Sequence, residues 1–169
     1  AASGLSAGLP LDYGLCPAAP DFPWLPHTDY AVLLTATSRD DKLWDEGHWI
    51  ELAGKLRQCG LAALFPGGNG LERERAERLA KAVPGAIAVP PLAIDALARL
   101  LAGARLAVGV DTGLTHLAAA LAVPTVAIYT ATDPGLTGVL GCGFYRNLGG
   151  VGAVPTPVRV LDECLAGLR

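Results

Sequence analysis

The chain has 169 residues, of which 51% are hydrophobic and 17% are charged, and its formal net charge is −3. This composition predicts a compact globular domain, or one domain and a fragment, and argues against long disordered segments. Acidic and basic residues are interspersed, so neither a basic surface for nucleic acid nor a charged tail is expected.

Membrane spans and metal sites are not expected either. The longest nearly apolar run, residues 117–131, is interrupted by Pro124 and is shorter than the roughly 18 residues that a spanning helix needs. No signal-peptide pattern opens the chain. The four cysteines lack the spacing of metal ligands, and we expect four buried or half-buried free thiols in a reducing, cytoplasmic compartment. The chain contains no methionine, even at position 1, so we expect a piece of a longer protein.

Regular structure is expected to begin after a proline-rich start. Residues 1–28 contain five prolines and no sustained hydrophobic period, which predicts the end of an upstream domain followed by a linker. Residues 29–169 then form the predicted domain, in which apolar segments alternate with amphipathic ones. The expected strands are 30–37, 61–65, 86–89 and two within 108–129, with a helix after each of the first four, a loop-rich segment over 130–157 and a last helix over 158–168.

Apolar strands that alternate with helices predict a parallel sheet with both faces covered, which is an α/β fold. Right-handed crossovers favour a doubly wound, Rossmann-like sheet in the order 3-2-1-4-5, with Trp44 and Trp49 in its core. In this order the first and fourth strands are neighbours between which the chain reverses direction. The ligand site is therefore expected at their carboxyl ends.

The turn after the fourth strand has the features of an anion site. A helix that starts at Thr112 or Gly113 would direct free backbone N–H groups and the positive end of its dipole into the crevice. Gly113 would also let a ligand approach the backbone closely. These features predict that the ligand carries negative charge.

The turn after the first strand supplies complementary groups. Lys42 would add a full positive charge across the crevice, and Thr37 and Ser38 would add hydroxyl groups. Several donors and a charge suit a diphosphate better than a lone carboxylate.

Simpler explanations of the same residues stay open. Asp111 could be only the N-cap of the helix, a common role for this residue type. His116 could be a packed helical residue, and Glu72 a solvated helix-start residue rather than an acceptor for ribose hydroxyls. The turn "PGGNG" at 66–70 is not a dinucleotide fingerprint and is explained equally by a tight connection. The turn "TDPG" at 132–135 lies on the same rim, where a ligand contact is also open.

The sequence Asp-Thr-Gly also occurs at the catalytic turns of aspartic proteases. Those enzymes need two such turns that share a proton, each within β structure. This chain has one, and the residues "LTHLAAALA" that follow it are helical in composition. A protease is therefore a remote alternative.

Four segments carry a family resemblance when they are taken together and in order. They are "TSRDDKLWDEGHW", "ERERAERLA", "LARLLAGARLAVGVDTGLTHLAAAL" and "YTATDPGLTG". The segments resemble the C-terminal half of lipopolysaccharide heptosyltransferases of type I, which are inverting glycosyltransferases of family 9 with the GT-B fold. Type II enzymes carry Asp-Ser-Gly where this chain has Asp-Thr-Gly. The resemblance runs from about residue 30 to the end.

This resemblance implies a donor-binding half. The donor would be ADP-L-glycero-D-manno-heptose, and an absent N-terminal half would bind the acceptor, Kdo on lipid A. In the implied site, Lys42 neutralises the phosphates, Glu72 binds the ribose and Asp111 holds sugar hydroxyls. Leu92 packs near the adenine. The implied donor-site residues are Thr37, Ser38, Lys42, Glu72, Leu92, Asp111, Thr112, Gly113 and His116.

The resemblance also implies an in-line displacement at the anomeric carbon with inversion. Lys42 and Asp111 would be its catalytic residues here, without a cofactor or metal, since the chain has no Asp-x-Asp motif. The family's general base is an Asp of the N-terminal half, so this chain is expected to transfer nothing alone. The full enzyme would work in the cytoplasm, at the inner face of the inner membrane, where peripheral contact with the membrane is possible. A non-catalytic nucleotide-binding module is the alternative.

Two positions depart from the family pattern. Gly67 stands where a tryptophan is common, which leaves the packing beside the adenine in question. Asp45 stands where a proline is common, at the entry to the first helix.

Overall fold

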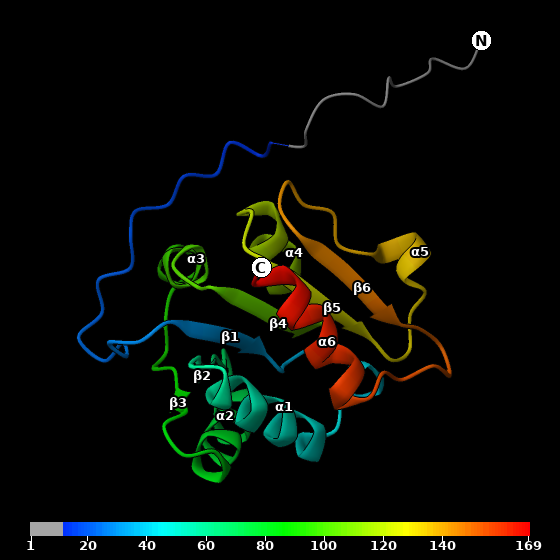
Figure 1. The fold of residues 1–169 in the computed structure, drawn as a ribbon, viewed down its shortest axis with the longest axis horizontal. Helices are drawn as coiled ribbons and strands as arrows, with labels where there is room; N and C mark the ends of the chain where they lie inside the picture. Colours follow the sequence, from blue (N-terminus) through cyan, green and yellow to red (C-terminus); the bar gives the residue numbers. More distant parts are fainter. Residues whose placement is uncertain (1–11) are drawn as a thin grey trace.

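The computed structural model describes residues 12–169. Residues 1–11, part of the predicted linker, lie outside the described residues. The described chain forms one parallel sheet in the order β3-β2-β1-β4-β5-β6, as Figure 1 shows. The predicted Rossmann-like order 3-2-1-4-5 is therefore confirmed, with a sixth strand added at one edge. The strands are β1 (Tyr30–Leu34), β2 (Ala62–Phe65), β3 (Ile87–Ala88), β4 (Leu106–Val110), β5 (Thr125–Tyr129) and β6 (Tyr145–Gly149).

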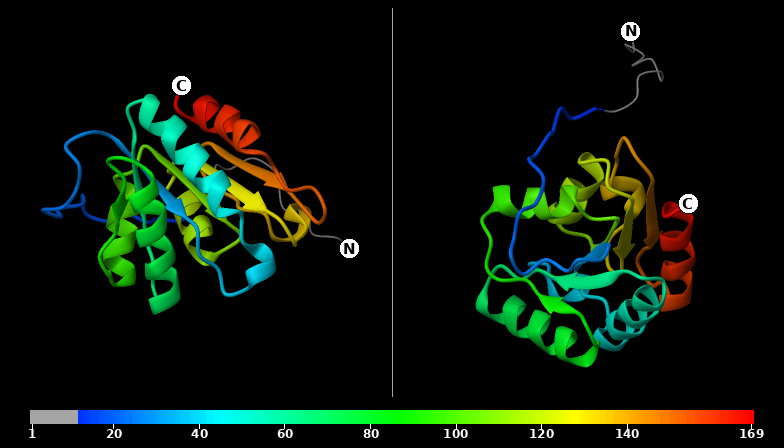
Figure 2. Two further views of the ribbon diagram at one scale, coloured as in Figure 1. Left: turned by 90° about the horizontal axis from the view of Figure 1, so that it is seen from below. Right: turned by 60° about the vertical axis from the view of Figure 1, so that its left-hand side comes forward.

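Helices cover both faces of the sheet (Figure 2). α1, α2 and α6 pack on one face, while α3 and α4 pack on the other. Because β1, β4 and β5 are buried along their whole lengths, their sequences are apolar on both faces. The helices are α1 (Glu46–Gln58), α2 (Gly70–Ala82), α3 (Ile94–Ala102), α4 (Gly113–Ala120), α5 (Pro134–Thr137) and α6 (Pro157–Gly167), and a short 3-10 helix, η1, spans Asp40–Lys42.

Local sequence explains where the first helix begins. Asp45 is the N-cap of α1, and its carboxylate accepts hydrogen bonds from the backbone N–H groups of Gly47 and His48. Asp45 therefore begins α1 as a side-chain cap. A proline, which the resemblance leads one to expect here, is another residue that commonly starts a helix. Trp44 and Trp49 are both buried, as predicted, and their rings meet edge to face at 4.9 Å.

Two expectations about the strands are wrong. β6 lies inside the segment predicted to be rich in loops. This strand was missed because its sequence "YRNLG" is polar and only Leu148 is buried. An edge strand of this kind lacks the apolar run on which sequence prediction depends. The first strand is also shorter than predicted, since residues 35–37 leave the sheet and turn toward η1.

The prediction of four buried or half-buried thiols is also wrong. All four cysteines are free, but Cys16, Cys59 and Cys142 are exposed. Cys16 and Cys142 lie in loops and Cys59 is the C-cap of α1, so none of these three side chains faces the core. Cys164 faces the core from α6, and burial raises the pKa of its thiol to about 12.

Part of the predicted linker packs on the domain. Phe22 stacks on Trp24 with 5.2 Å between ring centroids, and the Arg99 guanidinium of α3 lies over the Phe22 ring. Both aromatic side chains pack against the core on the α3 side. Among residues 12–169, none of the helices is long and apolar enough to cross a membrane.

α4 approaches β4 closely at Gly109. A β-carbon at this position would overlap the Thr115 hydroxyl and would lie 3.0 Å from Cβ of Leu34. The same hydroxyl donates a 2.7 Å hydrogen bond to the carbonyl of Val110, which ties the helix to the end of the strand. The absence of a side chain at Gly109 therefore sets the distance between α4 and the sheet.

We predict that Gly109→Ala lowers the free energy of unfolding by about 1–3 kcal/mol, because an overpacked core must shift. Urea denaturation measures the change. Gly54→Ala is the matched control, since a β-carbon there meets open space within α1. It should raise stability by up to about 1 kcal/mol through helix propensity. Equal destabilisation by both variants would contradict this account of Gly109.

Candidate functional site

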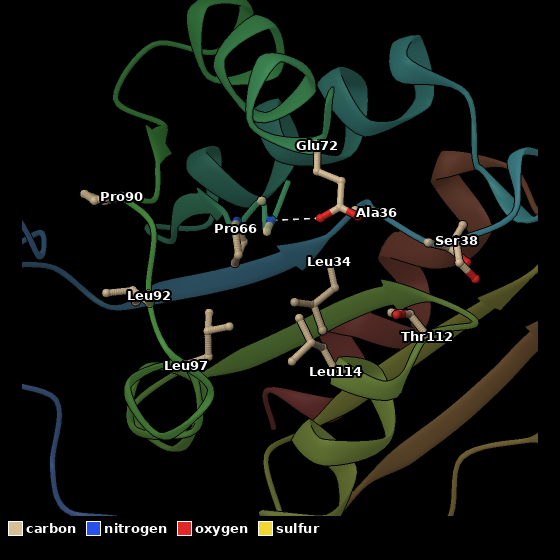
Figure 3. Close-up of a pocket in the computed structure, with 13 residues that line it drawn as sticks. Leu34, Ala36, Ser38, Pro66, Glu72, Pro90, Leu92, Leu97, Thr112 and Leu114 are labelled. Carbon is tan, nitrogen blue, oxygen red and sulfur yellow. Dashed lines mark hydrogen bonds between the residues drawn. The ribbon is translucent and has the colours of Figure 1, made fainter. Parts of the chain in front are cut away.

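The site lies where the sequence places it, at the carboxyl ends of β1 and β4. A cavity of about 150 Å³ opens there between the turn after β1, the turn after β2 and the start of α4. Figure 3 shows its two ends: Pro90, Leu92 and Leu97 lie at one, and Ser38 and Thr112 lie at the other. The cavity therefore changes from apolar to polar along its length.

The apolar end contains residues that sequence reasoning missed. Leu92 was expected there, but Leu97 of α3 and Leu114 of α4 line the same wall. Pro66, directly after β2, and Pro90, two residues after the end of β3, complete this wall. The only signal in the sequence is that position, because ligand contacts gather at the carboxyl ends of parallel strands.

Glu72 is partly exposed in the first turn of α2 and is hydrogen-bonded there. Its carboxylate accepts hydrogen bonds from the backbone N–H of Gly68 at 2.8 Å and from the Asn69 side-chain amide at 2.9 Å. Asn69 in turn accepts from the backbone N–H of Glu72, which completes a capping box at the start of α2. Glu72 therefore holds the turn at 66–70 in shape and still lines the cavity.

Gly67 has a steric reason to lack a side chain. A β-carbon there would lie 2.7–2.8 Å from the backbone of Glu72 and Arg73 in the first turn of α2. The backbone of α2 thus occupies the space that a larger residue would need. The lack of a side chain at Gly67 is thus matched by a close approach of this helix.

The start of α4 leaves backbone donors free for a ligand. Thr112 is its N-cap, and no side chain in the described part of the chain caps this helix. Asp45, Asn69 and Thr156 cap their helices with side-chain oxygens, whereas α3, like α4, has no side-chain cap. The first N–H groups of a helix have no partner inside it, so those of α4 can bind an anion. Asp111 is not the N-cap, and that simpler explanation of it is wrong.

Asp111 is instead the centre of a charged cluster. Its Oδ2 accepts hydrogen bonds from Nζ of Lys42 at 2.7 Å and from Oγ1 of Thr132 at 2.8 Å. Oδ1 faces Nε2 of the half-exposed His116 at 3.9 Å, which is beyond hydrogen-bond distance. The Asp111 side chain is 9% exposed and that of Lys42 is 19% exposed. This pair therefore connects the turns after β1 and β4 in a partly dry environment.

These contacts set the charge of Asp111. Burial alone would raise the pKa of its carboxyl group, but the hydrogen bonds from Lys42 and Thr132 and the charge of Lys42 outweigh burial and lower that pKa. Asp111 is consequently an anion at neutral pH, and it is the acceptor of the cluster rather than a proton donor.

The structure brings most of the predicted site residues together. Thr37, Ser38, Glu72, Leu92 and Thr112 line the cavity. The hydroxyl of Thr37 also makes a long hydrogen bond, 3.4 Å, to the carbonyl of Asp111, so the cluster adjoins the polar end.

The other predicted residues flank that polar end. Gly113 begins α4 and is exposed, while Lys42, Asp111 and His116 lie beside it. Thr132 belongs to the cluster although the sequence singled out only its turn. Within residues 12–169 no three His, Cys, Asp or Glu side chains are grouped so that they could hold a metal ion.

The fold and the site together define a Rossmann-like domain that binds its ligand at a topological switch point. A family model described as "Glycosyltransferase family 9 (heptosyltransferase)" matches residues 16–152. The chain belongs to this family. The single Asp-Thr-Gly turn is thus part of a glycosyltransferase domain and not of a protease.

Similar proteins agree with this assignment. Lipopolysaccharide heptosyltransferase 1 of Escherichia coli K12 is 49% identical over 113 residues, which are 67% of this chain and 35% of that protein. The same enzyme of Pseudomonas aeruginosa is 46% identical over 116 residues, 69% of this chain and 33% of that protein. The matched region thus spans about a third of the length of these curated relatives.

Solved structures share the fold. The E. coli heptosyltransferase WaaC with ADP has a TM-score of 0.73 at 39% identity, and the alignment covers 85% of this chain and 46% of that one. E. coli ADP-heptose lipopolysaccharide heptosyltransferase II has a TM-score of 0.75 at 25% identity, over 83% of this chain and 46% of that one. The predicted class, half of a GT-B glycosyltransferase, is confirmed.

We predict that Asp111→Asn lowers stability by about 1 kcal/mol at neutral pH, because hydrogen bonds to a charged group are stronger than neutral ones. The pKa of Asp111 is lowered from its ordinary value of 3.8 in the folded chain. Its extra stability is therefore present above that pH and is lost as the pH falls below it. Urea unfolding of both proteins from about pH 7 down to 3 should show the gap closing below about pH 4.

Asp41→Asn is the control for this titration. Asp41 pairs with Arg39, two residues away, but both side chains are more than half exposed, so solvent screens the pair. A pH-independent gap for Asp111→Asn, or an equal response of both variants, would show that the Lys42–Asp111 pair does not set the charge of Asp111.

Proposed function

We propose that this chain is the donor-binding half of a lipopolysaccharide heptosyltransferase of type I and that it binds ADP-L-glycero-D-manno-heptose. One observation carries the proposal: a single cavity passes from an apolar end, along Glu72, to the uncapped start of α4, and the Lys42–Asp111 pair lies beside that end. That sequence of surfaces matches the order of base, ribose, diphosphate and sugar in a nucleotide-sugar. Structures of the similar E. coli heptosyltransferase WaaC were solved with ADP and with ADP-2-deoxy-2-fluoro heptose.

Each part of the donor has a chemically suitable wall. The adenine would lie against Leu92 and Leu97, and the ribose hydroxyls would meet Glu72, whose carboxylate keeps acceptor capacity beyond its capping bonds. The diphosphate would face the backbone N–H groups at Thr112 and Gly113. The hydroxyls of Thr37 and Ser38 line the same end and would support it.

Lys42 and Asp111 would divide the work at the reacting end. Lys42 would neutralise the phosphates, so that it and α4 stabilise the ADP that leaves as an anion. Asp111, already charged, would accept hydrogen bonds from hydroxyls of the heptose, with His116 beside it. Lys42 and the start of α4 would supply positive charge at the diphosphate, and we propose that transfer needs neither a metal nor a cofactor.

The whole enzyme is proposed by extension from its relatives. Residues 1–28 would end an upstream domain and lead through a linker into the donor domain, residues 29–169. That upstream half would bind Kdo on lipid A and supply the base that deprotonates its hydroxyl. The enzyme would act in lipopolysaccharide inner-core synthesis, at the cytoplasmic face of the inner membrane, with peripheral contact to it.

We expect ADP to bind the chain and Lys42→Ala to weaken that binding about tenfold or more, since a hydrogen bond between charged groups is lost. Isothermal titration calorimetry at fixed ionic strength measures both dissociation constants. Lys55→Ala is the matched control, because Lys55 lies on the surface of α1 and pairs with Glu51. Equal ADP affinity for all three proteins would refute the phosphate role of Lys42.

We also expect no heptose transfer from ADP-heptose to Kdo-lipid A by this chain alone, because the proposed base lies in the other half. Mass spectrometry of the acceptor after long incubation measures transfer. Product formed by the chain alone would overturn the proposed division of catalytic groups. ADP binding without any added affinity for ADP-heptose would instead favour a nucleotide-binding module.

A further inference from the structure

Two threonines beyond β5 donate hydrogen bonds to Asp111 and to the residue next to Lys42. Thr132 donates from Oγ1 to Oδ2 of Asp111 at 2.8 Å. Thr130 donates from Oγ1 to the backbone carbonyl of Asp41, the residue next to Lys42, also at 2.8 Å. The segment "TAT" at 130–132, which follows β5, therefore bonds to both the turn after β1 and the turn after β4. The sequence predicted only that the turns after β1 and β4 meet.

The strand order explains why this segment can reach the pair. β4 lies between β1 and β5 in the sheet, so the chain that leaves β5 passes beside the turn that follows β4. Thr132 comes three residues after the end of β5 and immediately before Asp133, the N-cap of α5. A helix cap therefore determines where the backbone of Thr132 lies.

Thr132 and Lys42 share one oxygen of the carboxylate. Both donate to Oδ2, whereas Oδ1 is bonded to no donor among the described residues and faces His116 at 3.9 Å. The two donors differ in kind: the threonine hydroxyl is short and neutral, while the lysine is long, flexible and charged. If Lys42 turns toward a phosphate, Thr132 alone still holds Oδ2.

We propose that Thr132 is a positioning residue. Its hydroxyl holds Oδ2 of Asp111, so that Oδ1 can accept hydrogen bonds from the sugar of a nucleotide-sugar while Lys42 binds the diphosphate. This inference rests on the proposed function. A carboxylate that is 9% exposed needs donors to offset its loss of water, and Thr132 is one of the two that it has here. The lowered pKa of Asp111 agrees with this, since Thr132 is among its causes.

The test is Thr132→Val, which removes the hydroxyl and keeps the branched shape. We expect the affinity for ADP-heptose to fall about tenfold, while the affinity for ADP alone changes less than about twofold. Calorimetry with both ligands measures the two values. Thr132→Ser should restore the affinity for ADP-heptose, and Thr28→Val, at an exposed position far from the site, should change neither. Equal loss for both ligands would show a general disturbance and overturn the positioning role.

A second measurement separates this inference from the proposed function. Carbon-detected NMR of the ligand-free chain follows the titration of the Asp111 carboxyl group, and Thr132→Val should raise its pKa while Thr132→Ser does not. An unmoved pKa would overturn the inference even if the chain binds ADP-heptose. If the chain binds neither ligand, the proposed function fails, and the NMR titration still decides whether Thr132 holds Asp111. Circular dichroism confirms that each variant is folded.

Discussion

The ion pair between Lys42 and Asp111 is the interaction on which the site depends. It joins the turn after β1 to the turn after β4, two segments 69 residues apart in the chain. A parallel sheet places these turns side by side, but it doesn't by itself hold their side chains. The partly buried ion pair holds the two side chains together, because each charge would otherwise lose hydration without compensation. The hydroxyls of Thr37 and Thr132 then connect to the same residue.

This pair also has a consequence for the diphosphate ligand that we propose. Backbone donors at the start of α4 cannot move away, since they are part of the helix. Lys42 can, because its long side chain has several rotatable bonds and its partner Asp111 has a second donor. In the proposed site, rigid backbone donors would set the position of the diphosphate, and one mobile charge, Lys42, could follow it.

Much of the fold could be predicted from the sequence, for a physical reason. Strands buried on both faces must be apolar throughout, so β1, β4 and β5 stand out, and the polar turns after them mark the switch point. β6 could not be found in this way, because an edge strand with one buried residue has no such pattern. The capping box of Glu72 was missed, although Asn69 three residues before Glu72 is its sequence signature.

The site was predicted less completely because its contacts come from several turns. Lys42 and Asp111 were expected near each other once the strand order was assumed. Thr132 was not singled out, as a threonine in a turn has many ordinary roles. Only the geometry shows that its hydroxyl meets Oδ2 rather than a backbone group.

The close approach of α2 to Gly67 has a consequence for inhibitors. An adenosine analogue designed to stack on an aromatic ring at this position would find backbone there instead, and would lose that contact area. A compound that fills the aliphatic surface of Leu92 and Leu97 would keep its contacts. For the proposed donor site, selectivity for this protein could therefore be sought at the apolar end of the cavity.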